Sequence, residues 1–148
     1  MEKYEINKET AAIVGINEKF TKIVEKDNDY FISDVAYEVM DYSCQYFGSS
    51  YEGRVDGSKK MLGANYKLPI IVEESNNLIF FPISAADNPK CIWISLKWFD
   101  HVTKDGKDTK IHLKNGKKIY TKVSKYSIEN QVMRASRLSL ILNERKKG

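Results

Sequence analysis

The segment Ser43-Cys44-Gln45-Tyr46-Phe47-Gly48-Ser49-Ser50-Tyr51-Glu52-Gly53-Arg54 marks the point where a helical pattern gives way to a glycine-rich one. Before it, apolar side chains recur at the spacing of one helix face, which predicts an amphipathic helix from Asp34 to Phe47. Ser33 can cap this helix at its N-terminus. From Gly48 to Gly63, four glycines and a Ser-Ser pair predict a mobile loop with no regular element longer than a turn or two.

On either side of this segment, short apolar runs bounded by turn residues are typical of strands. They predict strands from Ala11 to Ile16, Thr21 to Glu25, Tyr30 to Ser33, Leu68 to Glu73, Leu78 to Ile83 and Cys91 to Leu96, with Trp98 to Val102 continuing the last after a bend. A chain of 148 residues with 42% hydrophobic content can form one domain with a sizeable core. We expect a single α+β domain over residues 1–148: a mainly antiparallel sheet, one helix before the central strands and a long C-terminal helix.

The segment from Thr109 to Val123 has the pattern of a hairpin whose register can be chosen. A two-residue turn would mix apolar and charged side chains on both faces, whereas a three-residue loop, Lys114-Asn115-Gly116 with Gly116 left-handed, pairs Ile111 with Ile119. We therefore predict the three-residue loop. The outer face then carries a basic stripe with one aromatic residue: Lys110, His112, Lys118, Tyr120 and Lys122. The stripe suits phosphate contacts, or a solvent face that discourages edge pairing.

The longest helix is predicted from Ser127, as its N-cap, to about Arg145. Its main apolar stripe faces the core, while Met133 and Leu140 lie on the opposite side. This second apolar edge is either a self-association surface or an edge covered by the N-terminal strands. Arg134 and Arg137 flank the main stripe and can either meet phosphates or frame the stripe.

Charge is distributed unevenly along the chain. Residues 1–56 carry six basic and twelve acidic side chains, a net charge of −6, whereas residues 57–148 carry eighteen basic and eight acidic ones, a net charge of +10. A basic face of this kind suits a polyanion, although a lysine-rich solvated surface is the alternative.

Several kinds of chemistry find no support in the sequence. The glycines fit neither a phosphate-binding loop nor a dinucleotide fingerprint, and the Cys and His residues are scattered singly, so no nucleotide cofactor and no metal are expected. Cys44 and Cys91 are expected to be buried and reduced. No apolar run is long enough to cross a membrane, so the chain is expected to be cytoplasmic. Because no catalytic motif stands out, the chain is not expected to be an enzyme.

Four blocks, in this order, resemble the ComK family of competence transcription factors from Gram-positive bacteria. They are the segment quoted above; Pro69-Ile70-Ile71-Val72 with Ser75-Asn76; Phe80-Phe81-Pro82 through Pro89-Lys90-Cys91-Ile92-Trp93-Ile94-Ser95; and Asn115-Gly116-Lys117 followed by Ser127-Ile128-Glu129-Asn130-Gln131-Val132 and Arg134.

The resemblance implies a transcriptional activator that reads A/T-rich boxes of double-stranded DNA through the minor groove, at the nucleoid, and switches on DNA-uptake genes. It also implies dimers that form tetramers on DNA, contact with RNA polymerase, and recognition by an adaptor of a ClpC-type protease. Arg54, on the predicted glycine-rich loop, is the leading candidate to enter the groove; the alternative is an ion pair with Glu52 or Asp56. The further DNA-contact candidates are Lys59, Lys60, Lys110, Lys118, Lys122, Arg134 and Arg137.

The chain departs from the family pattern at some basic positions. Asn88 stands where a basic residue often precedes Pro-x-Cys, and Arg137 and Ser139 shift the basic positions expected after Arg134. Family members also continue past the equivalent of Gly148 with a tail implicated in activation.

Two alternative functions stay open. The first is a short paralogue that modulates promoters without activating them, which the missing tail favours. The second is a protein-interaction module bound by a proteolytic adaptor, for which the acidic N-terminal third is a possible surface.

Overall fold

A computed structural model describes residues 3–148 and shows an α+β fold in which all paired strands are antiparallel. The strands are β1 (Thr10–Gly15), β2 (Thr21–Glu25), β3 (Asp29–Ile32), β4 (Ile70–Glu73), β5 (Leu78–Pro82), β6 (Ile92–Ser95), β7 (Phe99–Asp105), β8 (Asp108–Leu113) and β9 (Lys118–Thr121). The helices are α1 (Ala36–Tyr46), α2 (Tyr51–Leu62) and α3 (Lys125–Lys147). A six-stranded sheet has the order β3-β2-β1-β6-β5-β4, and a second sheet has the order β7-β8-β9.

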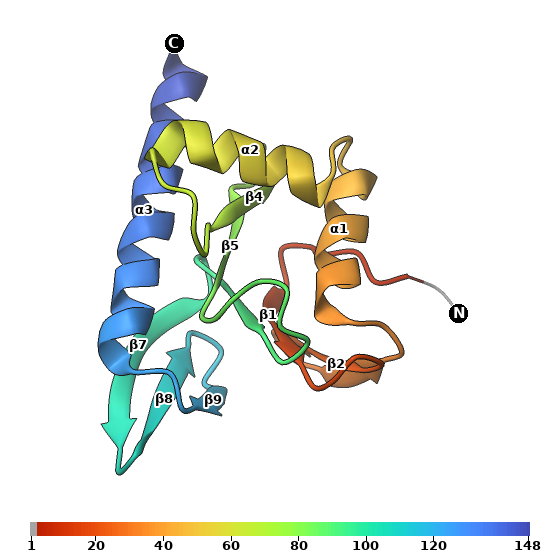
Figure 1. Ribbon diagram of the computed structural model, residues 1–148, viewed down its shortest axis with the longest axis vertical. Helices are drawn as coiled ribbons and strands as arrows, with labels where there is room; N and C mark the ends of the chain where they lie inside the picture. The colour runs from red at the N-terminus through yellow and green to blue at the C-terminus, as the bar shows by residue number, and fades with distance from the viewer. Residues whose placement is uncertain (1–2) are drawn as a thin grey trace.

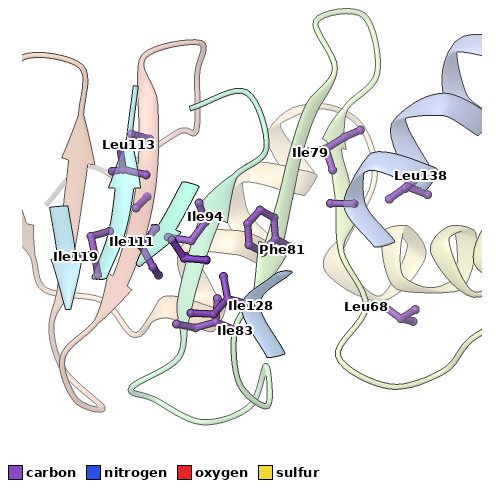
Figure 2. Packing of buried hydrophobic residues seen from close by; sticks show 14 of the residues in the cluster. Leu68, Ile79, Phe81, Ile83, Ile94, Ile111, Leu113, Ile119, Ile128 and Leu138 are labelled. Atoms are coloured by element: carbon purple, nitrogen blue, oxygen red, sulfur yellow. The ribbon is translucent and has the colours of Figure 1, made fainter. Parts of the chain in front are cut away.

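The six-stranded sheet separates two hydrophobic clusters. Side chains of a strand alternate between its faces, and on β5 Phe80 belongs to one cluster while Ile79 and Phe81 belong to the other. The first cluster contains buried residues of α1, such as Met40, so α1 covers that face. The second contains residues of β8, β9 and α3, and Figure 2 shows these side chains meeting those of β5 and β6. The small sheet and α3 therefore cover the opposite face (Figure 1).

The predicted loop between Gly48 and Gly63 is wrong, because the structure has the helix α2 there. Ser50 caps this helix with a side-chain oxygen that accepts a hydrogen bond from the Gly53 amide at 2.9 Å, and Gly63 ends it with φ 65°. Leu62 is buried in the core. The low helix propensity of the internal glycines is thus offset by a cap, a left-handed C-terminal residue and tertiary packing.

Three other boundaries differ from expectation. The helix α1 starts at Ala36 after Val35 and has no side-chain cap, so Ser33 does not cap it. The helix α3 starts at Lys125, three residues before the expected first turn, because Ser124 accepts a hydrogen bond from the Ser127 amide and serves as the N-cap. Phe99–Asp105 does not continue β6 but opens the second sheet as β7.

The predicted register of the β8–β9 hairpin is confirmed. Ile111 pairs with Ile119 and Thr109 with Thr121, and Gly116 has φ 87°. Because Ile111 and Ile119 are buried, the alternate positions of both strands face outward.

Candidate nucleic-acid interface

The outer face of the three-stranded sheet carries the predicted basic stripe. Lys110 and His112 come from β8, and Lys118 and Tyr120 come from β9, directly opposite them in the order His112–Lys118 and Lys110–Tyr120. Lys118 and Tyr120 are exposed, whereas Lys110 and His112 are partly exposed. The register that buries Ile111 and Ile119 is therefore what gathers these four side chains on one face.

The charges on this face are only partly neutralised within the chain. The Lys110 ammonium lies 5.4 Å from the centre of the Tyr120 ring, a cation–π contact that leaves the positive charge in place. Lys122 pairs with Asp108 at 2.8 Å. Among residues 3–148, no carboxylate forms an ion pair with Lys110 or Lys118. Both lysines are thus positioned to meet an external anion such as a phosphate.

Two histidines complete the outer face. His101 of β7 lies directly opposite His112 of β8, and the two imidazole rings stack with centroids 4.1 Å apart and planes at 4°. The sequence pattern predicts His112 on the stripe but not His101, because it does not indicate β7 as a partner strand of β8.

A loop anchors the small sheet to the acidic N-terminal hairpin. The Asn115 side-chain amide donates to the carbonyls of Glu25 and Lys26 at 3.2 Å each. The Lys117 ammonium donates to the Glu25 carbonyl at 2.8 Å and to Asp29 at 2.7 Å. The block Asn115-Gly116-Lys117 therefore fixes the position of the basic face, and Lys117 itself is committed to internal contacts.

The structure places Arg54 differently from the sequence prediction. It lies on α2, its side chain is 18% exposed, and its guanidinium pairs at 3.4 Å with Glu74 of the β4–β5 turn rather than with Glu52 or Asp56. Its Nε is buried and has no hydrogen-bond partner in the part of the chain that the structure describes. Arg54 thus ties α2 to the sheet, and a role in the groove would require this ion pair to open.

The remaining basic candidates do not join the stripe in one patch. Lys59 and Lys60 are exposed near the end of α2, which lies at the opposite end of the molecule from β8 and β9 (Figure 1). Arg134 of α3 donates to the carbonyls of Lys67 at 3.1 Å and Tyr66 at 2.7 Å. Burial lowers the pKa of Arg134, which agrees with a role inside the fold.

Arg137, by contrast, is exposed on α3 and pairs with no acidic side chain among the described residues. It therefore remains able to meet an external anion.

The segment Ser43–Arg54 forms the joint between α1 and α2. The Ser43 hydroxyl accepts a hydrogen bond from the buried Ile6 amide at 3.1 Å, and Asp41 of α1 accepts one from the Tyr51 amide at 2.9 Å. The Tyr51 ring packs edge-on against Trp93 with centroids 6.0 Å apart. A Cβ on Gly53 would lie 2.9 Å from the Ser49 hydroxyl oxygen, so a larger residue here would require the Ser49 side chain to move.

The second apolar edge of α3 is exposed, so the alternative in which the N-terminal strands cover it is wrong. Met133 is 68% exposed and Leu140 62%. Tyr126, seven residues before Met133, is also exposed and extends this edge by two helical turns. We refer to Tyr126, Met133 and Leu140 as the α3 ridge.

The two cysteines are free and buried, as expected. Burial raises the pKa of the Cys44 thiol to about 12, so it is neither reactive nor a ready metal ligand. Residues 3–148 bring no three His, Cys, Asp or Glu side chains together in a metal-binding group, and no described helix is both long and apolar enough to cross a membrane.

The fold and this face define an α+β domain whose exposed sheet surface is basic and aromatic. The sequence model described as ComK protein matches residues 1–147, and the competence transcription factor of Bacillus subtilis (strain 168) is 36% identical over 151 residues. That alignment covers 98% of this chain and 78% of the relative. The chain belongs to the ComK family, which is a family of transcription factors and not of enzymes. No solved structure matches the chain.

Proposed function

We propose that this chain is a ComK-type transcription factor that binds double-stranded DNA through the outer face of β7, β8 and β9. The observation that carries the proposal is the pairing of Lys110 and Lys118 with His112 and Tyr120 on one exposed sheet face, in a member of this family. Cations that lack internal partners gain the most from phosphate contacts, because binding releases condensed counterions. Lys122 can add a contact by exchanging Asp108 for a phosphate.

The proposal includes A/T-rich boxes read through the minor groove. A narrow groove holds a strong negative potential and rewards a cation on a thin element. The mobile loop first expected to supply that cation is a helix, but the β7–β8 hairpin has the required shape. Its turn contains Gly106 at φ 61° and the exposed Lys107, and it reaches beyond the rest of the small sheet (Figure 1). We place the groove-entering cation at Lys107 and the phosphate contacts on the face behind it.

Assembly on DNA belongs to the same proposal. Two paired boxes require a symmetric protein dimer, and the α3 ridge is an exposed apolar edge that can repeat from each subunit. We propose that the ridge supports a homodimer and, on two boxes, a tetramer. The exposed carboxylates of α1 and α2, such as Glu38 and Asp56, then remain open to RNA polymerase or to a ClpC-type protease adaptor.

A gel-shift titration tests DNA binding directly. A duplex with two A/T boxes is compared with one of equal length in which the boxes are replaced by G/C pairs. We expect tighter binding to the A/T duplex, and the variant Lys107→Ala to reduce this preference. Equal affinity for both duplexes contradicts groove reading, and no binding to either contradicts the interface.

Binding without activation is the alternative function, that of a promoter modulator. A reporter gene behind the same boxes distinguishes the two, since an activator raises expression and a modulator leaves or lowers it. A pull-down with and without DNA tests the third candidate, a module recognised by a proteolytic adaptor.

A further inference from the structure

The stacked histidines lie within the proposed DNA surface and carry chemistry that the proposal above does not use. His101 and His112 face each other across β7 and β8, with ring centroids 4.1 Å apart and planes at 4°. His101 is exposed and His112 is partly exposed, so both rings can be reached from outside. Two neutral imidazoles stack without repulsion at this distance, whereas two imidazolium ions repel each other.

Each ring has a different polar neighbour. The Nδ1 atom of His101 lies 3.3 Å from the Asp100 carboxylate. The Nε2 atom of His112 lies 2.9 Å from the Thr103 hydroxyl. A hydroxyl can donate to a neutral imidazole or accept from a protonated one, so this hydrogen bond is compatible with either state of His112.

The charges around His112 are mostly positive. Lys118 lies directly opposite it on β9, Lys110 is two residues away on β8, and His101 stacks on it from β7, while the Asp100 carboxylate acts in the opposite direction. Partial burial, followed by His101 and the two lysines, lowers the pKa of His112 below its ordinary value. An anion bound beside His112 would offset these positive charges and so favour a proton on its imidazole.

We propose that His101, His112 and Lys118 form a phosphate site that takes up a proton from solvent at His112 when DNA binds. The site rests on the proposed function, because its ligand is a phosphate diester of the bound duplex. The phosphate offsets the repulsion among the imidazoles and lysines, so bound DNA raises the pKa of His112. Affinity then rises as the pH falls through the bound-state pKa and levels off below the free-state pKa.

The first experiment needs no DNA. NMR titration of the histidine ring protons in the free protein should give His112 a pKa below the ordinary value near 6.5. His101→Gln removes the stacked imidazole that lowers the pKa of His112, so this pKa should move up in the variant. Two results would overturn the geometric basis of the site: a wild-type His112 pKa at the ordinary value, or a His112 pKa that does not change in His101→Gln.

The second experiment measures affinity for the A/T duplex at fixed ionic strength between about pH 5.5 and pH 8. A bound-state pKa one unit above the free-state value makes wild-type binding about tenfold tighter at the acidic end. His112→Gln keeps a polar side chain of similar reach and should make the affinity nearly independent of pH. Lys122→Ala, which touches neither imidazole, should weaken binding at every pH and keep the pH dependence.

The outcomes separate this site from the proposed function. Binding that does not change with pH in the wild type, or a pH dependence that survives His112→Gln, overturns the proton-linked site and leaves the DNA interface standing. No binding at any pH overturns the interface, and this site with it.

Discussion

The outer face of the small sheet and the segment Ser43–Arg54 are both rich in polar and aromatic residues, but they use them in opposite ways. On the sheet, Lys118 and Tyr120 point to solvent, and no acidic side chain in the described chain pairs with Lys118. In the segment, Tyr51 packs on Trp93 and Arg54 pairs with Glu74. The most distinctive sequence segment can therefore have a structural role at the junction of two helices, while the proposed binding surface has a less distinctive sequence.

This contrast separates stability from recognition. Residues of the α1–α2 joint contribute contacts inside the fold, so their loss should lower the free energy of unfolding. Residues of the sheet face contribute charge toward solvent, so their loss should change DNA affinity and its salt dependence. The four predictions that follow test this division, from the largest expected effect to the smallest.

The largest effect should be that of salt on wild-type binding. With about six phosphate contacts per dimer, the slope of log affinity against log salt should be near −5, so a fourfold rise in salt weakens binding by about 10³. Thermal unfolding over the same salt range should change little, because the joint is held mainly by packing. A slope shallower than about −2 would remove the case for the sheet face as a phosphate surface.

A pair of tyrosines gives the sharpest contrast between the regions. Tyr51→Ala removes an edge-on contact with Trp93 and should lower the free energy of unfolding by about 2–3 kcal/mol, less than for a fully buried aromatic because Tyr51 is half-buried. Tyr120→Ala, at an exposed position, should change stability by no more than about 0.5 kcal/mol and lower DNA affinity instead. Urea denaturation and gel shifts on both variants check this, and equal stability losses would contradict the division.

The α3 ridge tests whether a third surface acts independently of both regions. Leu140→Glu places a charge on the exposed apolar edge and should weaken the dimer at least about tenfold, about 1.4 kcal/mol, while the monomer stays folded. Leu140→Met is the matched control, since it keeps the side chain apolar and should keep the dimer. Sedimentation at micromolar concentration reports both, and an unchanged dimer in Leu140→Glu would place the contact elsewhere.

Much of the fold could be predicted from local patterns. The β8–β9 register followed from one requirement, that Ile111 and Ile119 share a buried face, and the structure has that register. The positions of Met133 and Leu140 opposite the main apolar stripe followed from helical periodicity in the same way, although periodicity left open whether this edge is covered. Predictions of this kind succeed because a buried face requires apolar side chains at every second residue of a strand and at every third to fourth residue of a helix.

The failures came from tertiary contacts that no local pattern reports. Four glycines favoured a loop, but the Ser50 cap and the burial of Leu62 stabilise α2. The partner of Arg54 is Glu74, twenty residues away in sequence, whereas the sequence suggests only the near neighbours Glu52 and Asp56. His101 was not predicted on the stripe because its position beside His112 depends on β7 pairing with β8. The residues between β6 and β7 carry no sequence pattern that indicates the start of a new sheet.

Arg54 provides the last prediction and the smallest expected effect, since one variant distinguishes two assignments of the same residue. A cation that enters an A/T minor groove would, on change to Ala, lose about 1–3 kcal/mol of binding to the A/T duplex alone. The observed ion pair with Glu74 instead predicts that Arg54→Ala lowers the free energy of unfolding by up to about 1 kcal/mol, because Glu74 is largely exposed to solvent.

We expect the second result, with binding to both duplexes nearly unchanged. Glu74→Gln is the control for the ion pair, because it removes the same charge interaction from the β4–β5 turn and should reproduce the stability loss. Lys118→Ala is the control for the surface: it should weaken binding to both duplexes alike and make the salt slope shallower by about 1. If Arg54→Ala weakens binding to the A/T duplex alone and Glu74→Gln leaves binding unchanged, Arg54 is a DNA-contacting residue. The joint would then be a recognition element as well as a structural one, because the charge that ties α2 to the sheet would also read DNA.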